Sequence, residues 1–413
     1  MLSSYRQIFA APGSLAFSAT GFLSRLPISM TGIGVVTMLS QLRGSYGVAG
    51  AVSATMALAA AAMGPQVSRL VDRYGQRRVA RPATAISVLA TIAMLLCAQA
   101  GTPDWTFFLC AIGMGTMPST GALVRARWAL LYRTDASKLH TAYALESVVD
   151  EVIFIVGPIL SIGLATSVFP EAGVLLAGIF LAVGVALFTA QRSTEPPVHP
   201  AARRSGGSAL SSAGLRVLVL TFVATGAIFG SVEVVTVAYA QAQQHTAASS
   251  LVLAVYALGS GLAGVVFGAL RPRGTAAHRF QAGVGVMAVS MLPLVLAAAW
   301  CSGTLGLVAV GGALFLSGLS IAPTMITAMG LVERLVPASQ LTEGMTWTTT
   351  GLALGVAGGS SLAGLVVDAA GAAAGYRVPL AAGVFALLVA LAGGRWLRPA
   401  ARVPAPPAVS VTP

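Results

Sequence analysis

The sequence predicts an all-α membrane protein with twelve transmembrane helices in two pseudo-symmetric six-helix bundles. Of its 413 residues, 56% are hydrophobic and only 9% are charged, whereas a soluble chain carries about 25% charged residues. Its long apolar runs are close to the ~20 residues that a helix needs to cross a bilayer. They lack the apolar–polar alternation of transmembrane β-strands.

Charged residues, glycines and prolines divide the apolar sequence into twelve predicted spans. Each span is long enough for a membrane helix, and the connections between spans are mostly short. The predicted spans are 14–39, 46–64, 82–100, 105–124, 141–166, 172–190, 215–240, 247–270, 280–300, 304–331, 341–367 and 377–397.

A short repeat supports the division into two halves. Phe17-Ser-Ala-Thr-Gly21 opens the first span, and Phe222-Val-Ala-Thr-Gly226 opens the seventh. Such a parallel repeat is expected when two bundles face each other across an axis along the membrane normal. We expect an N-terminal bundle at 1–190, a flexible cytoplasmic linker at 191–214, a C-terminal bundle at 215–397 and a disordered Pro-rich tail at 398–413.

The positions of the basic residues predict the orientation. Of the 24 Lys and Arg residues, all except Arg25, Arg43 and Arg377 fall at one side of the predicted membrane. Basic residues concentrate on the cytoplasmic side, so we expect a multi-pass plasma-membrane protein with both termini in the cytoplasm. Trp105 and Trp128 bracket the fourth span and are predicted to be interfacial anchors.

Two charged residues are predicted to lie inside the membrane in the first span of each half. Arg25 falls near the middle of the first span, and Glu233 falls in the seventh. Because an intramembrane charge needs a partner or a water-filled cavity, such residues point to function. The repeat places the two about one helical turn apart in depth, so a direct ion pair, or a substrate held between them, is expected.

The fifth span carries three acidic residues near the predicted end of the fourth span. Glu146 and Asp150 share a helix face, and Glu151 lies about 100° away. Arg125 and Arg127 end the fourth span. Two interpretations remain open: an inter-helix ion-pair network that gates the protein, or a protonation site, in which case Asp150 is expected to titrate.

The connection between the second and third spans carries a motif with family-level information. It reads Ser68-Arg-Leu-Val-Asp72-Arg73-Tyr-Gly75-Gln-Arg77-Arg78. Gly75 permits a tight turn, and Asp72 is placed to form a bond across the cytoplasmic face. The segment resembles the signature loop of the major facilitator superfamily, and with twelve spans and a central linker the resemblance covers essentially the whole chain.

A weaker echo links the two halves at the fifth and eleventh spans. Ala144-Leu-Glu146 is matched by Leu341-Thr-Glu343. We therefore expect a gating network on the cytoplasmic side formed by Asp72, Arg73, Gly75, Arg77, Arg125, Arg127, Glu146 and Glu343. The predicted substrate or proton site consists of Arg25, Glu233, Asp150 and Glu151.

The favoured function is secondary active transport by alternating access, with proton-coupled efflux of a drug-like or hydrophobic metabolite. Uptake of a polar or anionic metabolite, which Arg25 would favour, is the alternative, and a non-transporting receptor is a weaker one. No metal-ligand spacing, catalytic constellation or phosphate-binding loop is present in the sequence. We therefore expect no enzyme activity, cofactor, metal or nucleic-acid partner, and a monomer that meets substrate, protons and membrane lipid.

Overall fold

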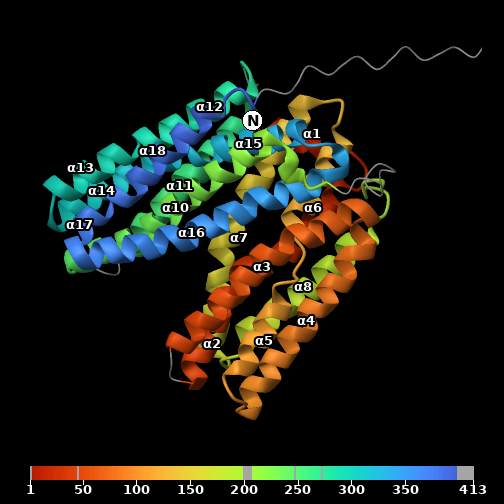
Figure 1. Ribbon diagram of the computed structural model, residues 1–413, viewed down its shortest axis with the longest axis horizontal. Helices are drawn as coiled ribbons and strands as arrows, with labels where there is room; N and C mark the ends of the chain where they lie inside the picture. Colours follow the sequence, from red (N-terminus) through yellow and green to blue (C-terminus); the bar gives the residue numbers. More distant parts are fainter. Residues whose placement is uncertain (1, 44–45, 199–206, 246–247, 271–272, 398–413) are drawn as a thin grey trace, which may run out of the picture.

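A computed structural model describes residues 2–43, 46–198, 207–245, 248–270 and 273–397. These residues form helices joined by short connections (Figure 1). The N-terminal half contains α1 (Leu2–Ile8), α2 (Ser14–Arg43), α3 (Tyr46–Tyr74), α4 (Gln76–Ala100), α5 (Trp105–Met114), α6 (Thr120–Leu131), α7 (Ala136–Ser167) and α8 (Ala172–Ala190).

The C-terminal half follows the same plan after a short 3-10 turn. It contains η1 (Ala209–Ser211), α10 (Ala213–Ala242), α11 (Ala248–Ala269), α12 (Ala276–Val289), α13 (Met291–Trp300), α14 (Gly303–Gly318), α15 (Ile321–Leu335), η2 (Ala338–Gln340), α16 (Leu341–Ala370), α17 (Ala372–Gly375) and α18 (Arg377–Ala392). Within the described residues, 11 helical segments are long and apolar enough to cross a membrane.

The fourth predicted span is broken more widely than the ninth and the tenth, which also divide, into α12 and α13 and into α14 and α15. Its first part, α5, has only 10 residues, and α6 begins after a turn and extends to Leu131, past the predicted end at residue 124. Pro118 lies in this turn and cannot donate a helical hydrogen bond. Gly115 ends α5 where any side chain would collide with Ala59 of α3. The break gives α6 its own direction, and the fourth crossing therefore consists of α5 and α6 together.

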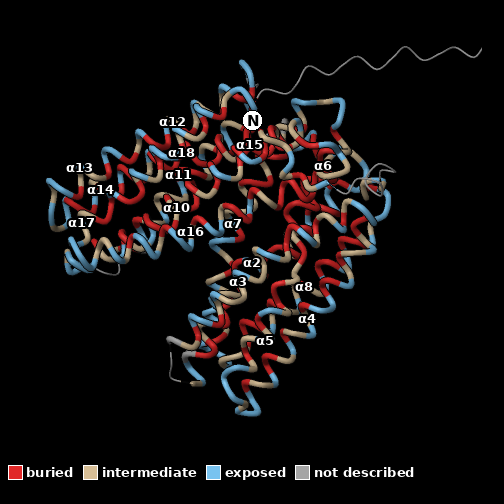
Figure 2. The backbone as a smooth tube through the Cα atoms, in the orientation of Figure 1, coloured by how far each residue is buried: buried red, intermediate tan, exposed pale blue. Residues whose placement is uncertain are grey.

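The two halves meet at one end of the bundle and separate toward the other (Figure 1). We call the meeting end the linker side, because it holds the α3–α4 turn at Gly75 and residues 191–198. The largest buried hydrophobic cluster takes residues from both halves, including Phe17, Trp128 and Met345. Separate clusters fill the C-terminal half and the N-terminal half farther from the linker side. The distribution of buried residues in Figure 2 follows this arrangement.

Helices α3 and α16 form one contact between the halves on the linker side. The hydroxyls of Ser68 and Thr346 lie 2.8 Å apart. The Asp72 carboxylate accepts hydrogen bonds from the backbone N–H groups of Thr342 (3.2 Å) and Glu343 (2.9 Å). These N–H groups belong to the first turn of α16, where a carboxylate is favoured by the unpaired donors and by the helix dipole.

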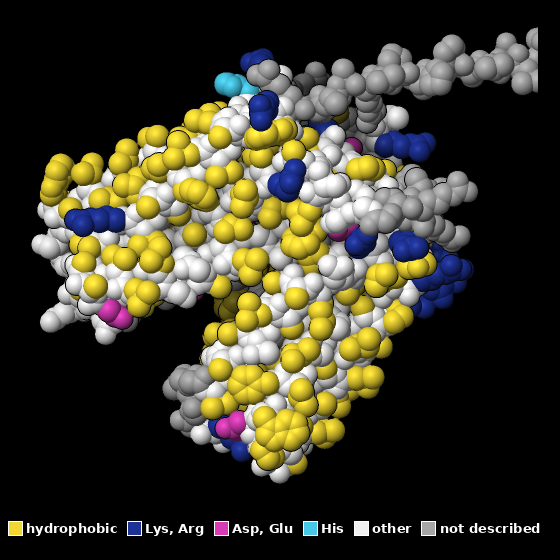
Figure 3. All heavy atoms as spheres, in the orientation of Figure 1, with side chains coloured by type: hydrophobic (Ala, Val, Ile, Leu, Met, Phe, Trp, Pro, Cys, Tyr) yellow, Lys and Arg dark blue, Asp and Glu magenta, His cyan; other side chains and the backbone are white. Residues whose placement is uncertain are grey.

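Helices α7 and α11 form the second contact. Thr141 Oγ1 donates to the carbonyl oxygen of Gly268 (2.9 Å), and a ring nitrogen of His140 lies 2.9 Å from that of Phe267. These two pairs of contacting helices are both bonded near the linker side, so the structure is closed there and hollow between the halves on the other side (Figure 3).

The predicted linker is only partly an independent segment. Thr194 and Gln191 are hydrogen-bonded to Arg127 of α6, so the described start of the linker is attached to the N-terminal half. At its other end, residues 213 and 214 already belong to α10. Residues 199–206 of the linker and the predicted disordered tail at 398–413 lie outside the described residues.

Candidate functional site

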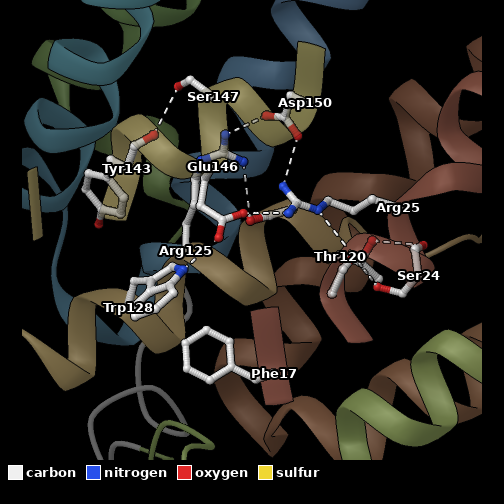
Figure 4. A network of polar contacts seen from close by, with 12 residues as sticks. Phe17, Ser24, Arg25, Thr120, Arg125, Trp128, Tyr143, Glu146, Ser147 and Asp150 are labelled. Carbon is white, nitrogen blue, oxygen red and sulfur yellow. Dashed lines mark hydrogen bonds and ion pairs between the residues drawn. The ribbon is translucent and has the colours of Figure 1, made fainter. Parts of the chain in front are cut away.

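Arg25 is the centre of a buried charge network between α2 and α7 (Figure 4). Its side chain is 1% exposed. One terminal nitrogen lies 2.5 Å from a Glu146 carboxylate oxygen, and the other lies 2.9 Å from an oxygen of Asp150. Glu146 and Asp150 are four residues apart on α7, so both carboxylates reach the same side of the helix.

Helix α6 supplies the other half of the network. Arg125 donates to the second oxygen of Asp150 at 2.6 Å, and the Trp128 indole N–H donates to Glu146 at 2.7 Å. Arg125 and Trp128 are three residues apart and share a face of α6. The break before α6 lets this face turn toward α7, and a bond of 3.2 Å from the Thr120 hydroxyl to the Ser24 carbonyl ties α6 to α2.

The network is neutral as a whole, with two guanidinium groups and two carboxylates. Asp150 bridges the two arginines and is 35% exposed, whereas Glu146 is fully buried. A buried charge is tolerated only when it is paired and hydrogen-bonded. Because each carboxylate here has a cation and at least two hydrogen-bond donors, both are suited to the ionised form.

The expected pairing of Arg25 with Glu233 is not formed. Glu233 of α10 is exposed, and it makes no ion pair with any residue that the structure describes. The prediction placed the two residues about one helical turn apart in depth, across the axis between the halves. It overlooked that α2 packs directly against α7 of its own half, which offers two acids within reach.

Glu151 differs from the other two acids of α7 because it faces α11 of the opposite half. One of its oxygens accepts a hydrogen bond from the buried Ser260 hydroxyl at 2.6 Å. Within the described part of the chain, Glu151 forms no ion pair. The 100° turn from Asp150 to Glu151 thus separates a carboxylate held by two arginines from one held by a hydroxyl alone.

The predicted gating residues on the linker side divide into two groups, one at the first turn of α16 and one at the turn between α3 and α4. Asp72 and Glu343 meet at the first turn of α16, where Glu343 is buried and accepts a 2.5 Å hydrogen bond from Ser208. Gly75 has a φ of +96° at the turn before α4, a conformation that favours glycine. The backbone N–H of Arg77 donates to Glu195, and the Arg73 guanidinium lies over the ring of Tyr74.

Arg127 does not join the network on α7, although the sequence grouped it with Arg125. It donates to Gln76 (2.8 Å) and Thr194 (2.8 Å), and its guanidinium stacks 3.9 Å from the centre of the Phe188 ring. On α6, positions 125 and 127 are about 200° apart, so the two arginines point to different neighbours.

Two residues of the site had been overlooked or misassigned from the sequence. Trp128 is completely buried and binds Glu146, so it is not an interfacial anchor. The sequence did carry a signal for this, because Trp128 follows Arg125 by three residues and therefore shares its face of α6. Ser260 carried no signal, because a serine in an apolar span is common and its partner lies 109 residues away. Among the described residues, no group of three or more His, Cys, Asp or Glu side chains could hold a metal ion.

The fold and the charged network between its helices define a two-half helical membrane protein of the transporter class. A model of the Major Facilitator Superfamily matches residues 17–313. The chain belongs to this superfamily, whose members are transporters and not enzymes, and it is a multi-pass integral membrane protein. No curated protein matched the sequence.

Several solved structures share the fold. A bacterial homologue of the iron transporter ferroportin, in an outward-facing state, is 18% identical with a TM-score of 0.72, covering 94% of this chain and 99% of that chain. The human organic anion transporter MFSD10 (TETRAN) is 17% identical with a TM-score of 0.69, covering 92% and 100%. The E. coli fucose:proton symporter FucP is 15% identical with a TM-score of 0.69, covering 92% and 98%.

Proposed function

We propose that the protein is a proton-coupled secondary transporter that exports a hydrophobic or amphipathic compound by alternating access, with Glu151 as the proton-binding group. The observation that carries the proposal is the hydrogen bond between Glu151 on α7 and Ser260 on α11, which joins the two halves. We further propose that the linker side is cytoplasmic, that both termini lie there, and that the protein works as a monomer in the plasma membrane.

The environment of Glu151 supports a proton-binding role. The charged or titratable groups near it are Asp150 on the same helix and Tyr256 on α11. Arg25 and Arg125, the nearby cations, are bound to other carboxylates. A partly buried carboxylate without a cation is costly to keep charged, so binding a proton relieves that cost. Asp150, which the sequence favoured for this role, is held between two guanidinium groups.

Coupling follows from the position of the Glu151–Ser260 bond. Rocking the two halves must separate α7 from α11 or slide one along the other. A change in the protonation of Glu151 alters the strength of a bond between the halves, and it therefore biases one conformation over the other. The fucose:proton symporter among the structural neighbours is a precedent for proton coupling on this fold.

Export of an apolar compound is favoured by the charge balance and by the surface of the hollow. The two arginines of the network are both neutralised by Glu146 and Asp150, so they leave no net positive charge for an anion. Figure 3 shows hydrophobic side chains at the bottom of the hollow between the halves.

The test is transport by purified protein in proteoliposomes with an imposed pH gradient, using ethidium as the amphipathic probe. We expect gradient-driven accumulation by the unaltered protein, and Glu151→Gln should reduce it to the level seen without a gradient. Asp368→Asn is the matched control, because Asp368 is an exposed acid on α16. Unchanged pH dependence in Glu151→Gln would refute the role of Glu151.

Uptake of a polar or anionic metabolite is the second candidate, and the bridging position of Asp150 favours it. Two guanidinium groups converge on one partly exposed carboxylate, and the same pair could hold a carboxylate of the substrate. MFSD10 transports organic anions. Loss of organic-anion uptake in a folded Arg25→Ala variant, with no ethidium transport by the unaltered protein, would favour this candidate over export.

A further inference from the structure

We propose that a basic pocket on the linker side of the N-terminal half binds a phosphate group, either in the headgroup of an anionic phospholipid or in a small soluble phosphate. The pocket lies between the α3–α4 turn, the first turns of α4 and the residues after α8. Its volume is about 820 Å³. The residues that matter to the inference are Arg77, Arg78, Arg81, Arg192, Glu195 and Pro197.

The pocket has an excess of positive charge. Four guanidinium groups line it together with one carboxylate. None of the four forms an ion pair with the residues that the structure describes. Figure 3 shows Lys and Arg side chains gathered at this end of the N-terminal half. An anion is therefore the expected ligand.

The one carboxylate of the pocket offsets only part of this charge. An oxygen of Glu195 is already engaged by the backbone N–H of Arg77 at 2.9 Å. Burial raises the pKa of the Glu195 carboxyl, while the charges of Arg127, Arg192 and Arg81 act in the opposite direction. Arg81 uses its Nε to donate to the Thr189 hydroxyl at 2.9 Å, which leaves its two terminal nitrogens available.

The geometry of arginine favours a phosphate over a simple anion. Guanidinium groups donate paired hydrogen bonds that match the oxygens of phosphate. The pocket also lies where α3 and α8 end and α4 begins. The ends of membrane helices lie at the depth of the lipid headgroups, where anionic lipids attract clustered basic residues.

Topology alone does not account for this arrangement. Basic residues orient a membrane protein wherever they lie in a short loop, so that role does not require four arginines around one cavity. Arg192 comes from the segment after α8, more than a hundred residues from Arg81, and Pro196 and Pro197 shape the wall beside it. The linker is thus brought to the pocket by folding.

The test measures thermal unfolding of the detergent-purified protein with four additives: short-chain phosphatidylglycerol, short-chain phosphatidylcholine, glycerol 3-phosphate and inorganic phosphate. Stabilisation by phosphatidylglycerol alone assigns the site to an anionic lipid. Equal stabilisation by glycerol 3-phosphate or inorganic phosphate assigns it to a soluble phosphate. No stabilisation by any phosphate-bearing anion, or an equal effect of phosphatidylcholine and phosphatidylglycerol, overturns the proposal.

The double variant Arg78→Gln/Arg192→Gln removes two exposed arginines of the pocket. We expect its apparent affinity for the stabilising ligand to fall about tenfold or more, the effect of losing one charge-assisted hydrogen bond. The control Arg133→Gln/Arg273→Gln removes the same charge at exposed positions outside the pocket. An equal loss in both double variants would mean non-specific surface attraction and would overturn the site. This readout needs no transport, so it is independent of Glu151.

Discussion

Two helix interfaces occupy corresponding places in the two halves: α2 against α7, and α10 against α16. They differ in chemistry, because charged side chains lie in the first and glycines line the second. The first holds the charges of Arg25, Glu146 and Asp150. Arg25 lies four residues past the last glycine of the Phe-x-Ala-Thr-Gly repeat. The corresponding residue of the second half is Gly230, which contacts the backbone of α16.

Glycines line the second interface from both sides. Gly226 and Gly230 of α10 face the carbonyl groups of Leu352 and Val356, and Gly355 of α16 faces that of Val223. A Cβ atom at any of the three glycines would overlap a carbonyl oxygen. Small residues allow two membrane helices to pack at the level of their backbones.

The difference between the two interfaces indicates which half can respond to protonation or to substrate binding. The glycine seam, which is the interface of Gly226, Gly230 and Gly355 between α10 and α16, has one close-packed arrangement and no group that changes charge. An ion-pair network in a low dielectric changes its energy strongly when one member is protonated or displaced. We infer that α10 and α16 move as one rigid pair, whereas α7 carries the groups that sense protons or substrate.

The largest expected effect comes from removing the cation of the charged interface. Arg25→Met leaves Glu146 buried without its ion-pair partner, so we expect a loss of about 3–5 kcal/mol. Thermal unfolding of the protein in detergent measures the change. Arg25→Met/Glu146→Gln should recover part of the loss, because it removes the uncompensated charge as well.

The control for this prediction is Arg377→Met, which removes an exposed arginine at the start of α18. Its effect should stay within about 0.5 kcal/mol, as expected for a surface position. Equal unfolding temperatures for Arg25→Met and Arg377→Met would mean that the charged interface contributes nothing to stability.

Much of the fold was predictable because span length and charge placement are local properties of the sequence. The two-half, twelve-span architecture was confirmed. The break between α5 and α6 was missed, although Pro118 and Gly115 lie in it, because the apolar runs on its two sides together have the length of one membrane span. Hydropathy records whether a residue tolerates lipid, and it does not record whether the helix axis is continuous.

The candidate site was harder to predict, because partner choice depends on which helices pack together. The shared face of Glu146 and Asp150 followed from their spacing of four. The partner of Arg25 did not, since it depends on the packing of α2 against α7 within one half. The repeat led instead to Glu233, which is exposed. Internal symmetry predicts equivalent positions, but it does not predict equivalent chemistry at them.

A smaller effect is expected from filling the glycine seam. Gly355→Ala places a methyl group against the Val223 carbonyl oxygen, so the helices must separate. Overpacking of this kind costs about 1–3 kcal/mol. Gly358→Ala is the matched control three residues away, because no atom lies within 4 Å of its Cβ. Thermal unfolding should separate the two variants. If both behave alike, close backbone packing is not what holds α10 to α16.

The smallest effect concerns the first turns of α7 and α16, which are capped in different ways. Asp135 caps α7 from its own chain neighbourhood, accepting from the Lys138 N–H at 3.0 Å. The first turn of α16 receives the Asp72 carboxylate from the other half. Asp135→Ala should lower stability by about 1 kcal/mol, the usual cost of losing an N-cap.

The effect of Asp135→Ala should also depend on pH. The Lys138 N–H lowers the pKa of Asp135 in the folded state. A carboxyl whose folded pKa lies below its unfolded value stabilises the protein above its ordinary pKa, and this contribution is lost as the pH falls through the lowered value. The unfolding temperatures of Asp135→Ala and the unaltered protein should therefore differ at neutral pH and converge in acid.

Asp72→Ala should instead change the distance between spin labels placed on the two halves, because the hydrogen bonds of Asp72 join them. If Asp72→Ala leaves that distance unchanged, the two caps are equivalent and the contact between α3 and α16 does not set the conformation.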